Sequence, residues 1–306
     1  MNAEKKLITV CVVTYNSSST IIETLDSIKN QDYGVGNIEL IIADDCSFDD
    51  TMCLINNWLE SNGFAFNSTH VIVGQYNVGL TKNINKAWKL SQGQWIKSIA
   101  GDDVLMPSCI TDNVNFVSKN NINSVVFSLM QSFSKDNSNN SQYPSKLQRS
   151  KLKQSREKQL EFLASAGGFA CAPSAFINRA MMEKVGFADE RFLMLEDSPL
   201  WLRILEAGEK LFFMDVITVK YRVGNSISQS GHSLFNIGHL QQRLLVDIYL
   251  FKEKCTIIVN LRKAVFYALC IGLSLVLGTK KTMINKLIYR VALLFKPYWL
   301  RDKLTK

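Results

Sequence analysis

The chain has few of the residues that hold metal clusters or disulfide frameworks. Its 306 residues include three histidines and seven cysteines. The cysteines are odd in number and scattered, with no C-x-x-C pair and no cysteine/histidine cluster at metal-ligand spacing. A disulfide scaffold and a zinc module are therefore not indicated, and a reducing, cytoplasmic setting fits best. None of the three histidines, His70, His232 and His239, is in a pair spaced for zinc. His232 could reach a metal from the C-terminal side, or it could be a surface histidine.

The first six residues do not form an apolar segment. Residues Met1 to Lys6 run directly into a strand-like segment, so we expect no signal peptide.

The net charge of +8 is not spread along the chain. Residues 252–306 hold 12 Lys/Arg and 2 Asp/Glu, a net +10, so the rest of the chain sums to −2. The basicity therefore belongs to the C-terminal tail, and no nucleic-acid partner is indicated. The tail also contains an apolar run from Ala264 to Thr279 with basic residues on both sides. The run is shorter than the roughly 20 residues that a spanning helix needs, so an interfacial helix and a packed core helix both remain open.

Strand-like and helix-like segments alternate through the first 130 residues. The β-rich run Ile8–Thr14 precedes a serine cluster in which Thr20-x-x-Glu23 predicts a capping box. Repeated strand–helix units predict an α/β fold with a largely parallel sheet covered by helices. Three further pairs follow: strand Ile38–Ala43 with helix 50–61, strand Val71–Gly74 with helix Leu80–Leu90, and strand Trp95–Ala100 with helix Ile110–Lys119. A last strand is predicted at Ser124–Leu129.

Polar and acidic residues follow each predicted strand. Ligands of open parallel sheets bind beyond the carboxyl ends of the strands, so these residues form one candidate nucleotide site. Asp44 and Asp45 could accept hydrogen bonds from a nucleobase imide or from ribose hydroxyls, or one of them could cap the following turn. The other members of this edge are Thr14, Tyr15, Asn16, Asn77, Asp102 and Asp103.

Asp102 and Asp103 are adjacent carboxylates behind a glycine. Hard oxygen ligands of this kind suit Mn²⁺ or Mg²⁺ bridging a diphosphate, and the cation would offset charge growing on the leaving group. We expect Asp103 to bind the metal and Asp102 to bind the metal or a ribose.

A second acidic pair, Glu196-Asp197, opens the amphipathic segment Ser198–Gly208. Negative charge is favoured at a helix N-terminus, so capping is one explanation. Asp197 is also a candidate general base, because transfer to a hydroxyl needs a carboxylate within hydrogen-bond reach of the acceptor. Between Ser134 and Lys158 the chain is polar, with no strand or helix period before about Leu147, and we expect a mobile loop that could act as a lid.

These residues occur in an order that resembles the family 2 inverting glycosyltransferases of the GT-A fold. The blocks that carry the resemblance are V-V-T-Y-N (12–16), I-I-A-D-D-C-S-F-D-D-T (41–51), Q-Y-N-V-G-L (75–80), N-K-A-W-K-L-S-Q-G-Q-W-I (85–96), G-D-D-V-L-M-P (101–107) and E-D-S-P-L-W-L-R (196–203).

The resemblance implies a nucleotide-sugar donor and favours UDP as its nucleotide. It places Thr14 and Tyr15 at the base or ribose, Asp45 at the base and Asp102 near the ribose. It places the metal on Asp103 and makes Asp197 the base of a single displacement with inversion. The chain departs from the family at Ala100, where a third acid is common, and at Gly224, where a histidine is common.

Many similar bacterial enzymes build O-antigen, capsule or other surface polysaccharide on a polyprenyl-diphosphate lipid. The resemblance therefore implies a saccharide acceptor, which a polyprenyl-diphosphate lipid could carry, and a cytoplasmic enzyme peripheral to the inner face of the membrane. We expect a glycosyltransferase domain at 1–225, with a nucleotide half (1–110) and an acceptor half (111–225), and a helical, basic region at 226–306.

Other classes fit less well. A dinucleotide-dependent oxidoreductase should carry glycines directly after the first strand, where this chain has Tyr15-Asn16 and serines. A receiver-like phosphoacceptor module would be much shorter. A non-catalytic carbohydrate- or nucleotide-binding scaffold at the membrane remains open, and Asp197→Asn separates it from an enzyme.

Overall fold

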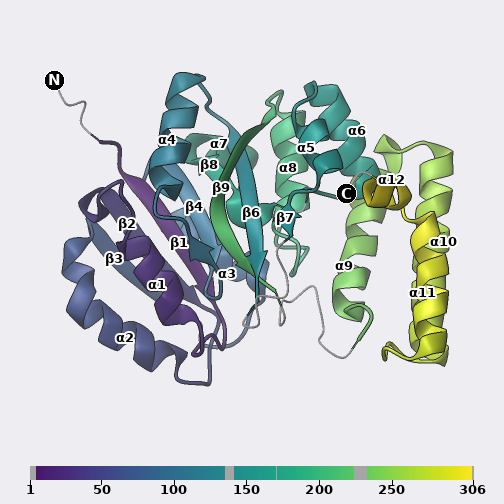
Figure 1. The fold of residues 1–306 in the computed structure, drawn as a ribbon, viewed down its shortest axis with the longest axis horizontal. Helices are drawn as coiled ribbons and strands as arrows, with labels where there is room; N and C mark the ends of the chain where they lie inside the picture. Colours follow the sequence, from purple (N-terminus) through teal and green to yellow (C-terminus); the bar gives the residue numbers. More distant parts are fainter. Residues whose placement is uncertain (1–4, 135–140, 170, 224–232, 305–306) are drawn as a thin grey trace.

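The computed structural model describes residues 5–134, 141–169, 171–223 and 233–304. A nine-stranded sheet runs through the molecule, and helices cover both of its faces (Figure 1). The path of the sheet is β3-β2-β1-β4-β8-β6-β9-β5, and β7 pairs with β6.

The first four strands in space are parallel. They are β1 (Ile8–Thr14), β2 (Ile38–Asp44), β3 (Ser68–Val73) and β4 (Trp95–Ala100). Every residue of β1 and β2 is buried, which fits strands rich in β-branched side chains and covered on both faces. The predicted parallel half of the sheet is therefore confirmed.

The second half of the sheet is mixed. Here β8 (Phe176–Asn178) is antiparallel to both β4 and β6 (Val125–Phe133), while β6 is parallel to β9 (Leu211–Arg222). The short β5 (Val104–Leu105) is antiparallel to β9, and β7 (Gln142–Tyr143) to β6. The long strand β9 was not predicted from the sequence.

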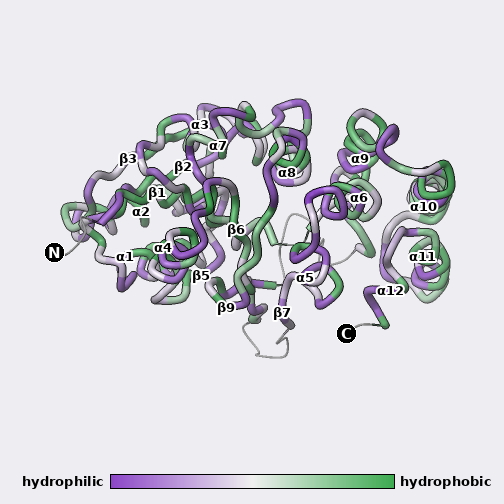
Figure 2. Tube along the Cα trace, turned by 90° about the horizontal axis from the view of Figure 1, so that it is seen from above, coloured by the Kyte–Doolittle hydropathy of each residue, from purple (hydrophilic) through white to green (hydrophobic). Residues whose placement is uncertain are grey.

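Helices α1 (Ile21–Lys29) and α4 (Cys109–Lys119) lie on one face of the sheet, and α3 (Leu80–Leu90) and α7 (Arg179–Val185) lie on the other (Figure 2). Helix α2 (Thr51–Asn62) packs beside α1. The bounds of β1, α3 and β4 agree with the sequence prediction.

One local prediction is wrong, and a second is wrong in part. Thr20 begins α1 without a capping side-chain bond, and its hydroxyl instead donates to the carbonyl of Gly101 at 2.8 Å. The predicted loop 134–158 contains α5 (Lys146–Leu152), which Ser145 and Gln148 cap reciprocally, and the start of α6 (Arg156–Ala166). Residues 135–140 of that loop lie outside the described residues, so the lid stays a prediction.

The C-terminal region is helical, as expected. It comprises α9 (Ile237–Val246), a π-helical turn (Asp247–Phe251), α10 (Ile257–Val276), α11 (Met283–Phe295) and α12 (Trp299–Leu304). Helices α10 and α11 pack side by side at the end of the molecule away from β3 (Figure 1). Most of the apolar run that the sequence placed at 264–279 lies in α10, which ends at Val276.

A buried ion pair fixes α10 to the rest of the chain. Lys263 Nζ donates to Asp247 Oδ1 at 2.6 Å and to the carbonyl of Ala164, in α6, at 2.6 Å. The Tyr267 hydroxyl donates to the other oxygen of Asp247 at 2.5 Å. Because the Lys263 and Asp247 side chains are 8% and 9% exposed, this pair is a fixed contact and not a surface one.

Candidate active site

The register of the parallel strands brings the predicted residues to one edge. Thr14 lies opposite Asp44 on β2, and Val13 lies opposite Ala100 on β4. Asp45 and the pair Asp102–Asp103 therefore follow neighbouring strands at the same carboxyl edge.

The end of β1 offers an aromatic platform and an unpartnered hydroxyl. Tyr15 is 45% exposed and meets Phe48 edge to face, with ring centroids 6.1 Å apart. Within the described residues the buried Thr14 Oγ1 has no hydrogen-bond partner. A Cβ on Gly101 would lie 2.9 Å from that oxygen, so only glycine leaves this space open. Both groups could serve a base or ribose.

Asn16 holds the loop after β2 against the end of β1. Its backbone φ is +51°, a left-handed conformation that asparagine tolerates. Its N–H donates to Ser47 Oγ at 2.8 Å, and its Oδ1 accepts from the Phe48 N–H at 3.0 Å. The side chain of Asn16 is thus used in shaping the loop.

The two acids after β2 both bind protein groups. Asp44 is fully buried and accepts from the Ser47 N–H at 2.8 Å and from the Ser47 hydroxyl at 2.5 Å. Asp45 accepts from the backbone N–H groups of Val78 and Gly79, each at 2.9 Å. Asp44 therefore closes its own turn, while Asp45 orders the loop before α3.

Asn77 belongs to the loop that Asp45 orders. Its side chain is exposed, and its Oδ1 accepts from the Gly79 N–H at 3.2 Å. This leaves the amide nitrogen at the surface of the predicted nucleotide edge.

The acids after β4 are tied to the end of β9. Asp103 is 1% exposed, and its Oδ1 accepts from the backbone N–H of Arg222 at 2.8 Å. Arg222 Nε donates to the Asp102 carbonyl at 2.7 Å, and its guanidinium also pairs with Glu23. Sequence reasoning assigned no role to Arg222.

Electrostatics at this pair favour an added cation. Burial and the neighbouring Asp102 carboxylate raise the pKa of Asp103 to about 8, against the effect of the Arg222 hydrogen bond and the positive charges of Lys97 and Arg222. Burial also raises the pKa of Asp102. Lys97, fully buried on β4, donates to the Pro173 carbonyl, and burial lowers the pKa of its ammonium group.

The donor set suits a cation that a diphosphate would share. No group of three or more His, Cys, Asp or Glu side chains in the described part of the chain is arranged to hold a metal ion. Mg²⁺ commonly uses only one or two protein carboxylates and takes its other ligands from phosphates and water. Asp102 and Asp103 fit that smaller role. His232 and Gly224 lie outside the described residues.

Asp197 stands at the first turn of α8 (Asp197–Glu206). Its Oδ1 accepts from the Ser198 N–H at 2.5 Å and from the Ser198 hydroxyl at 3.0 Å. Both Asp197 and Glu196 are partly buried. Burial and the nearby Asp197 charge raise the pKa of Glu196 to about 8.

The segment before α8 contacts the start of α3, which follows the loop that Asp45 orders. The Thr81 N–H donates to the Leu193 carbonyl at 3.2 Å, and the Thr81 hydroxyl donates to the Phe192 carbonyl at 2.5 Å. The segment that leads to Asp197 is thus joined to the predicted nucleotide edge through the start of α3.

Residues of α9 that sequence reasoning missed lie close to Asp197. Arg243 Nη1 donates to Ser198 Oγ at 3.2 Å. Burial and the Arg243 charge lower the pKa of His239, and the Asp197 charge acts in the opposite direction. No local motif marks either residue, because their roles depend on how α9 packs.

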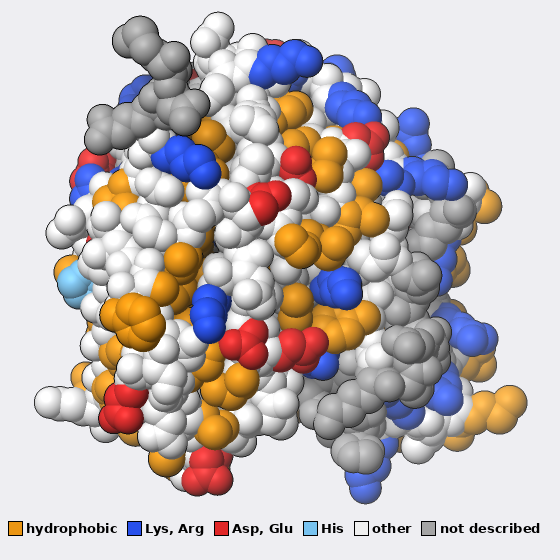
Figure 3. All heavy atoms as spheres, turned by 60° about the vertical axis from the view of Figure 1, so that its left-hand side comes forward, with side chains coloured by type: hydrophobic (Ala, Val, Ile, Leu, Met, Phe, Trp, Pro, Cys, Tyr) orange, Lys and Arg blue, Asp and Glu red, His pale blue; other side chains and the backbone are white. Residues whose placement is uncertain are grey.

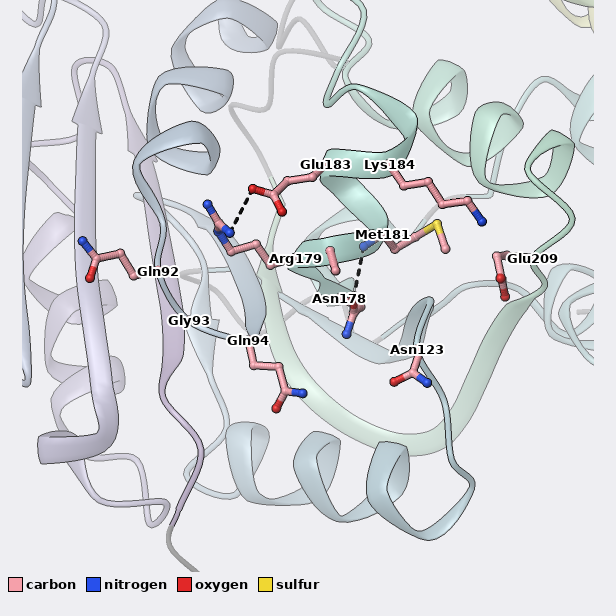
Figure 4. Close-up of a pocket in the computed structure, with 11 residues that line it drawn as sticks. Gln92, Gly93, Gln94, Asn123, Asn178, Arg179, Met181, Glu183, Lys184 and Glu209 are labelled. Atoms are coloured by element: carbon pink, nitrogen blue, oxygen red, sulfur yellow. Dashed lines mark hydrogen bonds and ion pairs between the residues drawn. The ribbon is translucent and has the colours of Figure 1, made fainter.

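A separate polar pocket of about 460 Å³ lies at the amino end of β4, opposite the acids (Figure 4). Gln92, Gln94 and Asn123 line it together with residues of α7. It carries none of the predicted site residues.

Comparison with known families decides the assignment. The model of the family described as "Glycosyl transferase family 2" matches residues 9–186, more than half of the chain. The chain belongs to glycosyl transferase family 2.

One curated relative resembles this family 2 chain over most of both lengths. The UDP-Glc:alpha-D-GlcNAc-diphosphoundecaprenol beta-1,3-glucosyltransferase WfaP of Escherichia coli is 26% identical over 219 residues, which cover 71% of this chain and 78% of the relative. Matches to other curated relatives cover as little as 18% of their length.

Solved structures agree with the fold of this family 2 member. Staphylococcus aureus TarS 1–349 in complex with UDP-GlcNAc aligns with a TM-score of 0.59 and 18% identity, covering 98% of this chain and 83% of TarS 1–349. The mannosyltransferase PcManGT of Pyrobaculum calidifontis, in complex with GDP-Man and Mn²⁺, aligns with a TM-score of 0.54 and 15% identity, covering 98% of this chain and 74% of PcManGT. The predicted GT-A fold is confirmed.

Proposed function

We propose that this family 2 glycosyltransferase moves a sugar from a UDP-sugar to a hydroxyl of a lipid-linked saccharide, with inversion. The observation that carries the proposal is the gathering of Thr14, Asp45 and the Asp102–Asp103 pair at one edge of the parallel strands. The named activity of WfaP, a UDP-Glc donor and a diphosphoundecaprenol-linked acceptor, supports the donor and acceptor classes.

The nucleotide would bind across the ends of β1, β2 and β4. The exposed ring of Tyr15 offers a stacking surface, and the Thr14 hydroxyl offers an unpartnered donor or acceptor. Asp45 would act at the base and by holding the 77–79 loop, on which Asn77 is exposed. Asp44 would support the turn, and Asn16 the loop beside it.

Asp102 and Asp103 would bind the ribose and the diphosphate side of the donor. A Mn²⁺ or Mg²⁺ ion there would supply positive charge for the leaving diphosphate. Asp103 would hold the ion, and Arg222 would keep the Asp103 carboxylate in place through its N–H.

Asp197 would take the acceptor proton. As the acceptor oxygen attacks the anomeric carbon, its O–H proton passes to the Asp197 carboxylate. The bond from the anomeric carbon to the diphosphate oxygen breaks, and UDP leaves with the electron pair. Attack from the face opposite the leaving group inverts the anomeric centre.

Asp197→Asn tests the catalytic assignment. We expect turnover to fall by about a thousandfold or more, because general-base catalysis contributes typically 10²–10⁴-fold. UDP-sugar binding, measured by calorimetry, should be largely retained. Retained turnover would overturn the proposal.

Screening UDP-glucose, UDP-galactose, UDP-N-acetylglucosamine and GDP-mannose with and without Mn²⁺ tests the donor class.

We also propose that the enzyme is peripheral to the inner face of the cytoplasmic membrane. Helix α10 is long and apolar enough to cross a membrane by length and composition alone. However, Lys263, in the first half of α10, is buried against Asp247 and Ala164, which argues for a face packed on protein.

The outer face of α11 supports an interfacial position. Met283, Ile284 and Leu287 are 90%, 66% and 64% exposed, and the exposed Lys286 and Arg290 lie beside them. Figure 2 shows apolar residues along both α10 and α11. Apolar side chains flanked by cations suit an anionic lipid surface.

On the face in Figure 3, by contrast, acidic, basic and apolar side chains are interspersed, which does not favour a nucleic-acid partner.

A further inference from the structure

Helix α9 reaches the helix start that carries Asp197. Arg243 Nη1 donates to Ser198 Oγ at 3.2 Å, and its Nη2 donates to the Ala166 carbonyl, at the end of α6, at 3.4 Å. One guanidinium therefore joins three helices at the position next to the proposed base.

The chemistry of arginine fixes the direction of this hydrogen-bond chain. A guanidinium has only donors, so Ser198 Oγ must accept from Arg243. The single hydroxyl proton of Ser198 is then free for Asp197, whose Oδ1 lies 3.0 Å away. Since the Ser198 N–H also donates to Oδ1, two bonds from Ser198 orient the carboxylate. Within the described residues, no hydrogen bond to Oδ2 is recorded.

Two glycines at the end of α6 leave space for the Arg243 guanidinium. Gly167 has a φ of +83°, and a Cβ there would lie 2.2 Å from Arg243 Nη2. Gly168 has a φ of +151°, and a Cβ there would lie 3.0 Å from Ser198 Oγ. Two consecutive glycines thus leave room for both partners of the bond. A side chain at Gly167 would displace the guanidinium, and one at Gly168 would crowd Ser198 Oγ.

Helix α9 makes a second contact with the same segment. Gln242 Oε1 accepts from the Leu193 N–H at 3.0 Å, four residues before Asp197. The start of α9 is itself capped by Asn236, whose side chain accepts from the His239 N–H at 3.1 Å. The helix therefore supports the approach to Asp197 at two points.

We propose that Arg243 is a positioning residue for glycosyl transfer, which orients the Asp197 carboxylate through Ser198 and so makes α9 part of the catalytic unit. The inference rests on the proposed role of Asp197 as the base. Arg243 acts through Ser198 and does not itself meet the sugar.

The first experiment measures steady-state kinetics of Arg243→Gln in the full chain. We expect kcat to fall by about a hundredfold, since small misplacements of a catalytic group cost this much. The KM for UDP-sugar and the calorimetric affinity for UDP should stay near wild type, because the nucleotide edge is not touched. Arg243→Lys should recover part of the loss, because one ammonium can still reach Ser198.

Ser198→Ala supplies a second variant that removes only one oxygen. It should lower kcat by a similar factor, and Ser198→Ala combined with Arg243→Gln should be no slower than the slower single variant. Such coupling is expected only if both side chains act through one chain of bonds. Independent multiplication of the two losses would overturn the proposal.

Arg156→Gln is the matched control. Arg156 Nη1 donates to the Leu205 carbonyl at 2.9 Å, at the other end of α8. A loss of kcat equal to that of Arg243→Gln would mean that general loosening of α8 is responsible, and would overturn the inference. Unchanged kcat in Arg243→Gln would do the same.

Asp197→Asn separates this inference from the proposed function. If Asp197→Asn keeps full turnover, the base assignment fails and the inference fails with it. If Asp197→Asn is inactive while Arg243→Gln is fully active, only the role of Arg243 is wrong.

Discussion

The carboxylate of Asp103 accepts a hydrogen bond from the backbone N–H of Arg222, although 119 positions separate the two residues. The contact joins the end of β4 to the end of β9. The acidic pair is thus held by a strand from the far half of the sheet, and the site depends on the whole sheet being formed.

Metal removal should stop turnover. We expect EDTA to abolish transfer and Mn²⁺ or Mg²⁺ to restore it in the wild type, because the diphosphate would lose its cation. Asp103→Asn should lower kcat by about a hundredfold, as removing one electrostatic group at a transition state typically does. Donor turnover with and without added metal measures both effects. Full activity in EDTA would contradict the metal assignment.

Asp45→Asn should weaken the loop before α3. The amide has one acceptor oxygen where the carboxylate supplies two, so the N–H of Val78 or Gly79 loses its partner. We expect a loss of about 2 kcal/mol in the free energy of unfolding and a higher donor KM. Urea denaturation and kinetics measure these. Asp50→Asn is the control, since Asp50 is exposed and makes no side-chain cap bond; an equal loss there would refute the explanation.

Glu196 should make the ligand-free protein less stable as the pH rises. Its pKa is about 8 in the folded state, against an ordinary value of 4.5. Between these values the folded protein holds a proton that the unfolded chain has released, so the free energy of unfolding falls with increasing pH. We expect Glu196→Gln to reduce the drop in melting temperature across this window. Parallel curves for wild type and variant would contradict the prediction.

Lys263→Met should be strongly destabilising. It leaves the Asp247 carboxylate buried without its cation, and breaking a buried pair costs about 3–5 kcal/mol. Adding Asp247→Asn removes the stranded charge and should recover more than half of that loss. Urea denaturation of the single and double variants measures this. A double variant as unstable as Lys263→Met alone would show that the ion pair is not the cause.

Vesicle binding should depend on the outer face of α11. Replacing Ile284 and Leu287 with serine should weaken co-sedimentation with anionic vesicles by about tenfold or more, since burying one such side chain contributes about 1.5–3 kcal/mol. Phe64→Ser is a matched control, because Phe64 is 86% exposed on another part of the molecule. Equal effects from both replacements, or none from either, would remove α11 from the membrane proposal.

The acids could be found from the sequence because they follow short apolar strands, where strand order alone determines their place. Strand β9 could not be predicted from the sequence. Its pairing with β6 contains register shifts around Leu129, which break the alternation of apolar and polar residues that predicts a strand. Thr20 was misjudged because its hydroxyl found a tertiary partner, Gly101, in place of its own helix. Arg243 was missed because its role comes from helix packing.

The buried Lys263–Asp247 pair has a practical consequence for the design of shortened chains. A cut before α10 would leave Asp247 behind and discard its partner, and it would also remove Asp302 of α12, which accepts from the Ser145 hydroxyl on the catalytic side. Such a fragment would therefore lose interactions of the residues that remain, in addition to the residues that were removed. Expression and localisation studies should therefore retain the complete C-terminus and vary only its outward-facing side chains.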